Sequence, residues 1–157
     1  MPRPPKKRSI GTPPLFSAFK PAGVRRNSGT ALRLALDEFE AIRLADHEGM
    51  DHAESAALMG ISRSTFSRLV EKARHTVARL LVEGCCLEIA GGEVHFQGNM
   101  FRCRNCGESF SVGFNFVLTE CPTCNSTELI DFAGGFGHGR CCWNHHHRER
   151  GTGEVEE

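Results

Sequence analysis

Apolar residues recur every three to four positions between Leu36 and Ala45, with charged residues between them. This spacing is typical of an amphipathic helix that buries one face. Asp37 and Glu40 add negative charge near its start, which the helix dipole favours, and Gly49 predicts where the helix has ended. The pattern therefore predicts a first helix before Gly49.

The same periodicity predicts two further helices joined by a tight turn. The earlier one runs from about Asp51, a candidate N-cap, to Met59, and Gly60 can adopt the positive φ angle that ends it. The later one runs from the candidate N-cap Ser62 to about Val82. Its apolar stripe is predicted to comprise Phe66, Leu69, Val70, Ala73, Val77 and Leu80.

Two short helices joined by a tight, glycine-containing turn are the layout of a helix-turn-helix. Ala56 is small where the two helices must cross closely, and Gly60 follows four residues later. In such motifs the N-terminal end of the second helix enters the major groove, where Arg pairs with guanine and hydroxyls reach bases or phosphates. We expect Arg63 and Arg68 to read bases. The full set of candidate DNA-binding residues is Arg63, Ser64, Thr65, Ser67, Arg68 and Lys72. The alternative is a three-helix bundle with a solvated polar face.

Charge is unevenly distributed along this chain of 157 residues, although its formal net charge is zero. Residues 1–36 hold eight basic residues and no acidic one, whereas the last ten residues hold four acids. A basic arm favours an anionic partner, with double-stranded DNA as the leading candidate and a solvated arm without a partner as the alternative. No apolar stretch resembles a membrane span or a secretory signal, so we expect a cytoplasmic protein with no membrane partner.

Three stretches together resemble the domain of unknown function 134 family, also labelled uncharacterised protein family 0251: "MPRPPKKR", "FKPAG" and "LDEFEAIRLADHEGMDHAESAALMGISRSTFSRLVEKARHTVARLLVEG". The resemblance covers roughly residues 1–92. It implies a helix-turn-helix similar to region 4 of bacterial sigma factors and a role in transcription, in which RNA polymerase or another transcription protein is a possible partner. It implies no target sequence, ligand or mechanism.

Two Cys-x2-Cys pairs, Cys103/Cys106 and Cys121/Cys124, are separated by fourteen residues. Each pair can place two thiolates on one metal ion, and together they supply the four sulfurs of a tetrahedral site. Zinc is the expected metal, and iron is possible. Such a site is coordinatively closed, so it is expected to be structural, in a zinc-ribbon-like domain whose strands include "SFSVGFNFVL". Unligated thiols or a redox dithiol are the alternatives.

The C-terminal stretch "GGFGHGRCCWNHHHRER" contains a possible second metal site. Its candidate ligands are His138, Cys141, Cys142 and His145. A labile site there, joined to a DNA-binding domain, would make a metal or redox sensor. Adjacent cysteines are poorly placed for one tetrahedral ion, however, and glycine-rich flanks give little preorganisation. The alternative is a flexible tail that binds metal only adventitiously.

These patterns predict a mainly α N-terminal helix-turn-helix domain plus a small β, zinc-ribbon-like domain. Residues 86–96 predict two short strands about the Gly91–Gly92 turn. The expected divisions are a basic irregular arm (1–33), the helix-turn-helix domain (34–92), the zinc-ribbon-like domain (93–132) and a disordered Gly/Cys/His-rich tail (133–157).

The expected function is that of a sequence-specific DNA-binding transcriptional regulator. A homodimer is expected, because one recognition helix covers only a short half-site. The two alternatives are a metal- or redox-responsive sensor acting through the tail and a protein-interaction adaptor of the transcription machinery. An enzyme is not expected, because each metal constellation is either closed or poorly formed.

Overall fold

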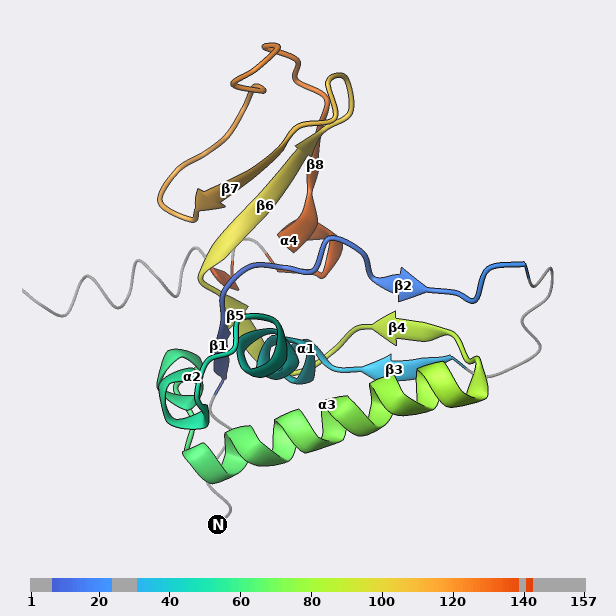
Figure 1. The fold of residues 1–157 in the computed structure, drawn as a ribbon. Coiled ribbons are helices and arrows are strands. Elements are labelled where there is room, and N and C mark those ends of the chain that lie inside the picture. Colours follow the sequence, from blue (N-terminus) through green and yellow to red (C-terminus); the bar gives the residue numbers. More distant parts are fainter. Residues whose placement is uncertain (1–6, 24–30, 139–140, 143–157) are drawn as a thin grey trace, which may run out of the picture. The chain divides into compact units, whose positions relative to one another are not determined.

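The computed structural model describes residues 7–23, 31–138 and 141–142. The chain divides into two compact units (Figure 1). Unit 1 comprises Met1–Ile10 and Phe16–Val94, and unit 2 comprises Gly11–Leu15 and His95–Glu157. None of the described helices combines the length and apolar character needed to cross a membrane.

Unit 1 contains the three helices that the periodicity predicts, and they form at the predicted positions. They are α1 (Leu36–Ile42), the π-helix η1 (Arg43–His47) that continues it, α2 (His52–Met59) and α3 (Arg63–Glu83). The spacing of apolar residues does not indicate the π-helical segment, in which Leu44 is buried.

Local side-chain and backbone chemistry sets the ends of α2 and α3. The Asp51 carboxylate accepts hydrogen bonds from the N–H groups of Ala53 and Glu54, at 2.7 and 2.9 Å, and the Ser62 hydroxyl accepts one from the Thr65 N–H at 3.2 Å. Gly60 ends α2 in the left-handed conformation (φ 65°) that a side chain would strain. Both predicted N-caps are therefore confirmed.

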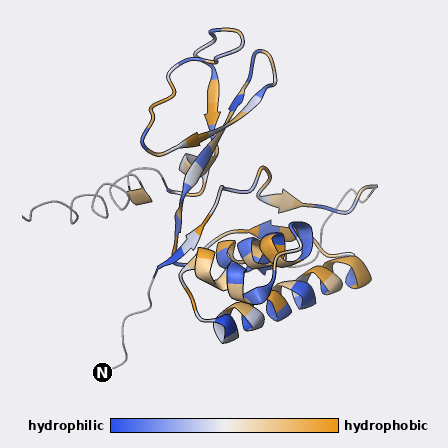
Figure 2. Ribbon diagram, turned by 60° about the vertical axis from the view of Figure 1, so that its left-hand side comes forward, coloured by the Kyte–Doolittle hydropathy of each residue, from blue (hydrophilic) through white to orange (hydrophobic). Residues whose placement is uncertain are grey.

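One face of α3 forms the core of unit 1 by packing against α1, α2 and β3 (Leu32–Leu34). Hydrophilic and hydrophobic segments alternate along its turns in Figure 2. Four members of the predicted stripe are buried: Phe66, Leu69, Val70 and Ala73. Val77 and Leu80 are only partly buried, and Leu81 and Val82 are 76% and 86% exposed. The stripe therefore anchors the N-terminal half of the helix.

The acidic residues of α1 are buried rather than solvated. Asp37, Glu38 and Glu40 are all 5% exposed or less. Each carboxylate has a basic partner, and the pairs are Asp37 with Arg8, Glu38 with Lys72, and Glu40 with Arg43. Carboxylates tolerate burial only when paired in this way, so these three pairs tie α1 to the β1 segment, to α3 and to its own continuation.

The N-terminal segment of unit 1 is partly regular. β2 (Ala18–Phe19) and β3 flank β4 (Leu87–Ile89), with β4 antiparallel to β2 and parallel to β3. In β1 (Arg8–Ile10) the Arg8 N–H donates to the carbonyl oxygen of Glu93 at 3.0 Å. The prediction of an irregular arm over residues 1–33 is therefore wrong for β1 and β2. Their hydrogen-bond partners lie far along the chain, where local composition gives no sign of them.

Both strands predicted around Gly91–Gly92 exist, as β4 and β5 (Val94–Phe96). They do not form a hairpin with each other, because β4 pairs with β2 and β3 instead. Gly91 and Gly92 have positive φ angles of 80° and 99°, and the Gly91 carbonyl accepts a hydrogen bond from the Leu36 N–H at 3.0 Å. This turn therefore fixes the start of α1.

Unit 2 is built on a three-stranded antiparallel sheet in the order β7-β6-β8 (Figure 1). Its strands are β6 (Gly98–Cys103), β7 (Ser109–Gly113) and β8 (Leu129–Asp131). A short helix, α4 (Phe132–Gly135), follows β8 directly. The stretch predicted to supply strands, residues 109–118, does so only over β7.

Buried Asn99 of β6 holds α4 in place. Its side-chain amide donates to the Asp131 carboxylate at 2.7 Å, and its side-chain carbonyl accepts from the Ala133 N–H at 2.9 Å. Asp131 in turn caps α4 by accepting from the Gly134 N–H. The predicted disorder of residues 133–157 is therefore wrong for α4. The hydrogen bonds that stabilise this helix come from Asn99, more than thirty residues earlier in the chain.

Candidate functional site

The N-terminal half of α3 carries all six residues predicted to contact DNA. Arg63, Ser64, Arg68 and Lys72 are exposed, and Thr65 and Ser67 are half-buried. They lie opposite or beside the buried stripe, on turns that continue directly from the Ser62 cap. The helix thus presents basic and hydroxyl side chains to solvent at the end where its free N–H groups also attract anions.

The hydroxyl groups on this surface already have neighbours. The Ser62 hydroxyl lies 3.1 Å from that of Ser64 and 2.8 Å from that of Thr65. The Ser67 hydroxyl lies 2.9 Å from Nδ1 of His52, whose ring also meets Phe66 edge-on at 5.2 Å. The sequence does not predict this contact of His52 with Ser67, because the two residues lie on different helices, fifteen positions apart. These hydroxyls therefore help to shape the turn between α2 and α3.

Most of the cations on α3 are paired with carboxylates. Lys72 Nζ lies 2.6 Å from Glu38. Arg74 donates two hydrogen bonds to Asp46, which lower the pKa of that carboxyl, and Arg79 donates two to Glu83. In the described residues, Arg63 and Arg68 make neither a hydrogen bond nor an ion pair through their guanidinium groups. These two arginines are therefore available to an external partner.

The pairing of Lys72 gives it a structural role beside the predicted DNA contact. Its side chain is 73% exposed, but that of Glu38 is only 4% exposed. We expect Lys72→Ala to lower the free energy of unfolding by about 1–2 kcal/mol, because a nearly buried carboxylate loses its cation. Urea denaturation measures this loss. In a Glu38→Gln background the same substitution should cost little, and an equal cost in both backgrounds would contradict the pairing.

The four cysteines of the Cys-x2-Cys pairs meet at one end of the unit 2 sheet. Cys103 closes β6, and the Gly107 N–H donates back to the Cys103 carbonyl at 3.0 Å. The second pair repeats this turn, with the Asn125 N–H donating to the Cys121 carbonyl at 2.8 Å. Gly107 and Asn125 both have positive φ angles, 79° and 59°, and asparagine is the residue other than glycine that best tolerates them. Asn125 is a feature that sequence reasoning missed.

The geometry of these sulfurs fits a metal ion. All four Sγ atoms lie within 4.8 Å of one another, and the Cys103–Cys124 and Cys106–Cys121 separations are both 3.6 Å. Sulfurs at about 2.3 Å from a tetrahedral zinc ion would be about 3.8 Å apart. Asn105 donates to Cys124 Sγ, and this bond, with one from the Ser126 N–H, lowers the pKa of the Cys124 thiol to about 6. The hydrogen bond from the Glu108 N–H lowers the pKa of the Cys106 thiol, but desolvation and its hydrogen bonds to the neighbouring sulfurs outweigh that bond and raise this pKa to about 12. A metal ion would bind all four sulfurs as thiolates, so metal binding would release protons.

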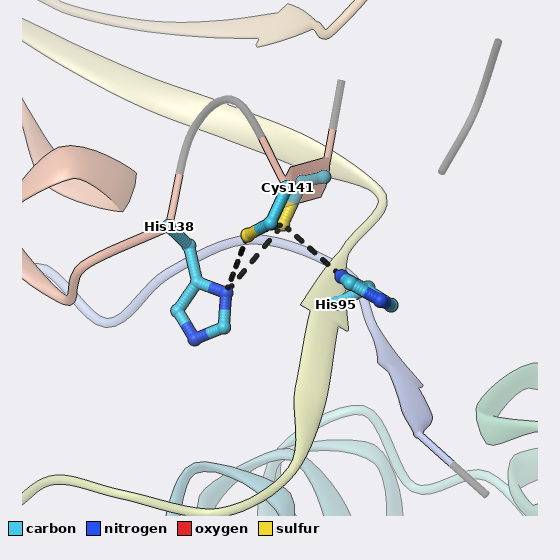
Figure 3. A group of neighbouring side chains, drawn as sticks. His95, His138 and Cys141 are labelled. Carbon is cyan, nitrogen blue, oxygen red and sulfur yellow. Dashed lines mark hydrogen bonds between the residues drawn. The ribbon is translucent and has the colours of Figure 1, made fainter. Parts of the chain in front are cut away.

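A second cluster of metal-binding side chains lies in unit 2, and we call it the His95 cluster (Figure 3). It consists of His95, His138, Cys141 and Cys142, whose nearest ligand atoms all lie within 4.8 Å of one another. Three of these residues were predicted from the sequence. The fourth predicted ligand, His145, lies outside the described residues, and His95 was not predicted at all. His95 and Cys142 are 47 positions apart in the sequence, which explains why no spacing motif reveals the pair.

This chain is similar to known proteins over nearly its whole length. The family model described as "Protein of unknown function DUF134" matches residues 1–97. A UPF0251 protein of Moorella thermoacetica is 43% identical over 154 residues, which cover 98% of this chain and 99% of that protein. A UPF0251 protein of Chloroherpeton thalassium is 43% identical over 143 residues, covering 89% and 95%. No solved structure matches.

The similarity therefore extends through both units, and the resemblance seen in the sequence is confirmed at the level of the family. None of these names states a ligand, a partner or an activity. The chain belongs to the DUF134 family, whose members include the UPF0251 proteins.

Proposed function

We propose that this protein is a sequence-specific DNA-binding transcriptional regulator. In this proposal α2 and α3 form a helix-turn-helix, and the three-stranded sheet with its four cysteines is a zinc-ribbon-like domain. The observation that carries it is the contrast among the cations of α3. Lys72, Arg74 and Arg79 form salt bridges with carboxylates, whereas Arg63 and Arg68 stand exposed near the start of the helix and form no salt bridge in the described part of the chain. The charge of Arg63 does act on Asp51, whose pKa is lowered mainly by the hydrogen bond from the Glu54 N–H and to a smaller extent by Arg63.

Arg63 and Arg68 have the chemistry that base reading needs. A guanidinium group can donate two hydrogen bonds to O6 and N7 of guanine in the major groove. Ser64 lies beside them and can reach a phosphate, since its hydroxyl retains capacity beyond its contact with Ser62. Glu71 is exposed one turn after Arg68 and would repel phosphate, but it can accept a hydrogen bond from the cytosine amino group.

The four-Cys site supports the proposal of a zinc-ribbon-like domain, because its four sulfurs can fill the coordination shell of one metal ion. Four thiolates without an open position hold a metal for structural purposes, with zinc as the first choice and iron as the alternative. Its sheet has three short strands and only a few buried apolar side chains, so a metal ion would supply stability that the core lacks. We therefore assign the metal no catalytic step.

The proposed partners are double-stranded DNA and a second copy of the chain. One recognition helix reads only a few base pairs, and two-fold pairing doubles the length of the site. RNA polymerase or another transcription protein is a further possible partner, by the resemblance to sigma region 4.

Selection from a randomised duplex pool at near-physiological salt tests this proposal. Metal-replete protein should enrich a palindromic motif, and its half-site spacing would report the geometry of the dimer. A pool without any enriched motif would overturn DNA reading. A protein partner captured after nuclease treatment would then favour the adaptor function.

The His95 cluster favours a second candidate function, that of a metal- or redox-responsive regulator. Two thiols and two imidazoles next to one another could change state with metal supply or oxidation. In that case, Cys141→Ser with Cys142→Ser would abolish a metal-dependent change in DNA affinity while leaving the four-Cys site filled.

A further inference from the structure

We propose that the His95 cluster binds a second transition-metal ion, distinct from the ion of the four-Cys site, and that His95 completes its coordination. The inference stands on the geometry of unit 2 and does not depend on DNA binding. The bound ion would be a metal that prefers thiolate ligands, and two sulfurs and two imidazole nitrogens would coordinate it. Zinc is the first choice.

The distances in the cluster match the edges of a tetrahedral site. Cys141 Sγ and Cys142 Sγ lie 3.7 Å apart, and zinc–sulfur bonds predict about 3.8 Å. His138 Nδ1 lies 3.3 Å from the Cys141 sulfur and 3.6 Å from the Cys142 sulfur, where a nitrogen and a sulfur on one zinc ion would be about 3.6 Å apart. Adjacent cysteines, which the sequence suggested were poorly placed, therefore can share one ion.

His95 reaches the same point from a different part of the chain. Its Nδ1 lies 3.7 Å from Cys142 Sγ, and in Figure 3 its ring points toward the cysteines from β5 while His138 approaches from the segment after α4. His95 is 8% exposed and Cys142 is fully buried. The imidazole nitrogen and the thiol sulfur that meet here are both donors that zinc and related transition metals bind.

Contacts with Phe96 hold two ligands of the cluster in place. The Phe96 N–H donates to Cys142 Sγ at 3.3 Å, a hydrogen bond that fixes the position of the sulfur. The Phe96 ring meets His138 edge-on, with ring centroids 5.1 Å apart, which restricts the orientation of that imidazole. Neither contact requires a metal ion, so the site is preorganised.

The scaffold beneath His138 is also ordered. Asn99 and Asp131 fix α4, and the His138 N–H then donates to the Ala133 carbonyl at 2.9 Å. Gly137 makes the turn between them with a φ angle of 75°. These hydrogen bonds hold His138 in position before metal binds, whereas a flexible tail would bind metal only weakly and adventitiously.

Cobalt(II) titration of the untagged full-length protein, under reducing and anaerobic conditions, tests the proposal. Wild-type protein should bind two equivalents, one with the intense sulfur-to-cobalt absorption of four thiolates and one with the weaker absorption of two. His95→Asn and Cys141→Ser should each weaken the second equivalent by at least about 10–100-fold, since even outer partners of metal ligands contribute that much. The first equivalent should be unchanged, which shows that unit 2 still folds.

Matched controls are available in the chain. Cys85→Ser and His47→Asn remove the same side-chain types outside both clusters, and both variants should keep two equivalents. A single equivalent in the wild type would overturn the second site. If His95→Asn bound both equivalents with unchanged affinity, His95 would not be a ligand and its part in the proposal would be overturned.

Discussion

Replacing Cys106 by serine should remove the metal from the four-Cys site and unfold the β7-β6-β8 sheet, while α1, α2 and α3 stay folded. Cys106 is exposed, so the substitution perturbs little packing of its own. Metal binding contributes about 10–16 kcal/mol to the folding of small structural zinc domains, far more than three short strands can supply. Amide hydrogen exchange measures both units at once, and the strand amides should lose their protection.

Cys85→Ser is the control, because Cys85 belongs to unit 1 and to neither metal cluster. It should leave exchange in the sheet unchanged. Strong chelation of the wild type should reproduce the effect of Cys106→Ser. Strand amides that stayed protected in the metal-free protein would show that the sheet holds itself together and that the four cysteines serve another purpose.

Substituting Arg68 or Arg63 by alanine should lower affinity for the selected DNA site by about 1–3 kcal/mol per half-site, which is roughly 5–150-fold. Affinity for unrelated duplex should fall much less, because a bidentate contact to guanine contributes only where guanine is present. Competition binding against the selected site and a scrambled duplex measures the two losses separately.

Arg74→Ala provides the comparison, since Arg74 lies on the same helix but is held by two hydrogen bonds to Asp46. It should leave the ratio of specific to non-specific affinity unchanged. Equal losses on both duplexes for Arg63→Ala and Arg68→Ala would show that these arginines contact phosphate and do not read bases.

The parts of the fold that the sequence predicts correctly rest on local interactions. Asp51 caps residues two and three positions away, and Ser62 caps a residue three positions away. Gly60 ends α2 through its own φ angle. The two Cys-x2-Cys turns are local as well, so the four-Cys site can be recognised from spacing alone. The partners in each cap and in each Cys-x2-Cys turn lie within four positions of one another, although the two cysteine pairs are themselves fourteen residues apart.

The features that the sequence did not reveal depend on contacts between distant segments. Lys72 was predicted to meet DNA, but its pairing with Glu38 depends on how α3 packs against α1. His95 meets His138, Cys141 and Cys142 through the folding of unit 2, and no short stretch of sequence contains all four. His145 was chosen instead because it is near Cys142 in the sequence, and proximity along the chain is the only distance that a sequence displays.

The buried acids of α1 have a consequence for how salt would affect binding. Asp37, Glu38 and Glu40 neutralise Arg8, Lys72 and Arg43, so those three cations release few counterions when a duplex approaches. Each phosphate contact steepens the fall of log affinity with log salt by about 0.9. With Arg74 and Arg79, five of the ten lysines and arginines that the structure describes in unit 1 are thus paired with carboxylates of unit 1 itself. A steep salt dependence would therefore come from cations outside these pairs, which include Arg63, Arg68 and the other basic residues of the N-terminal segment.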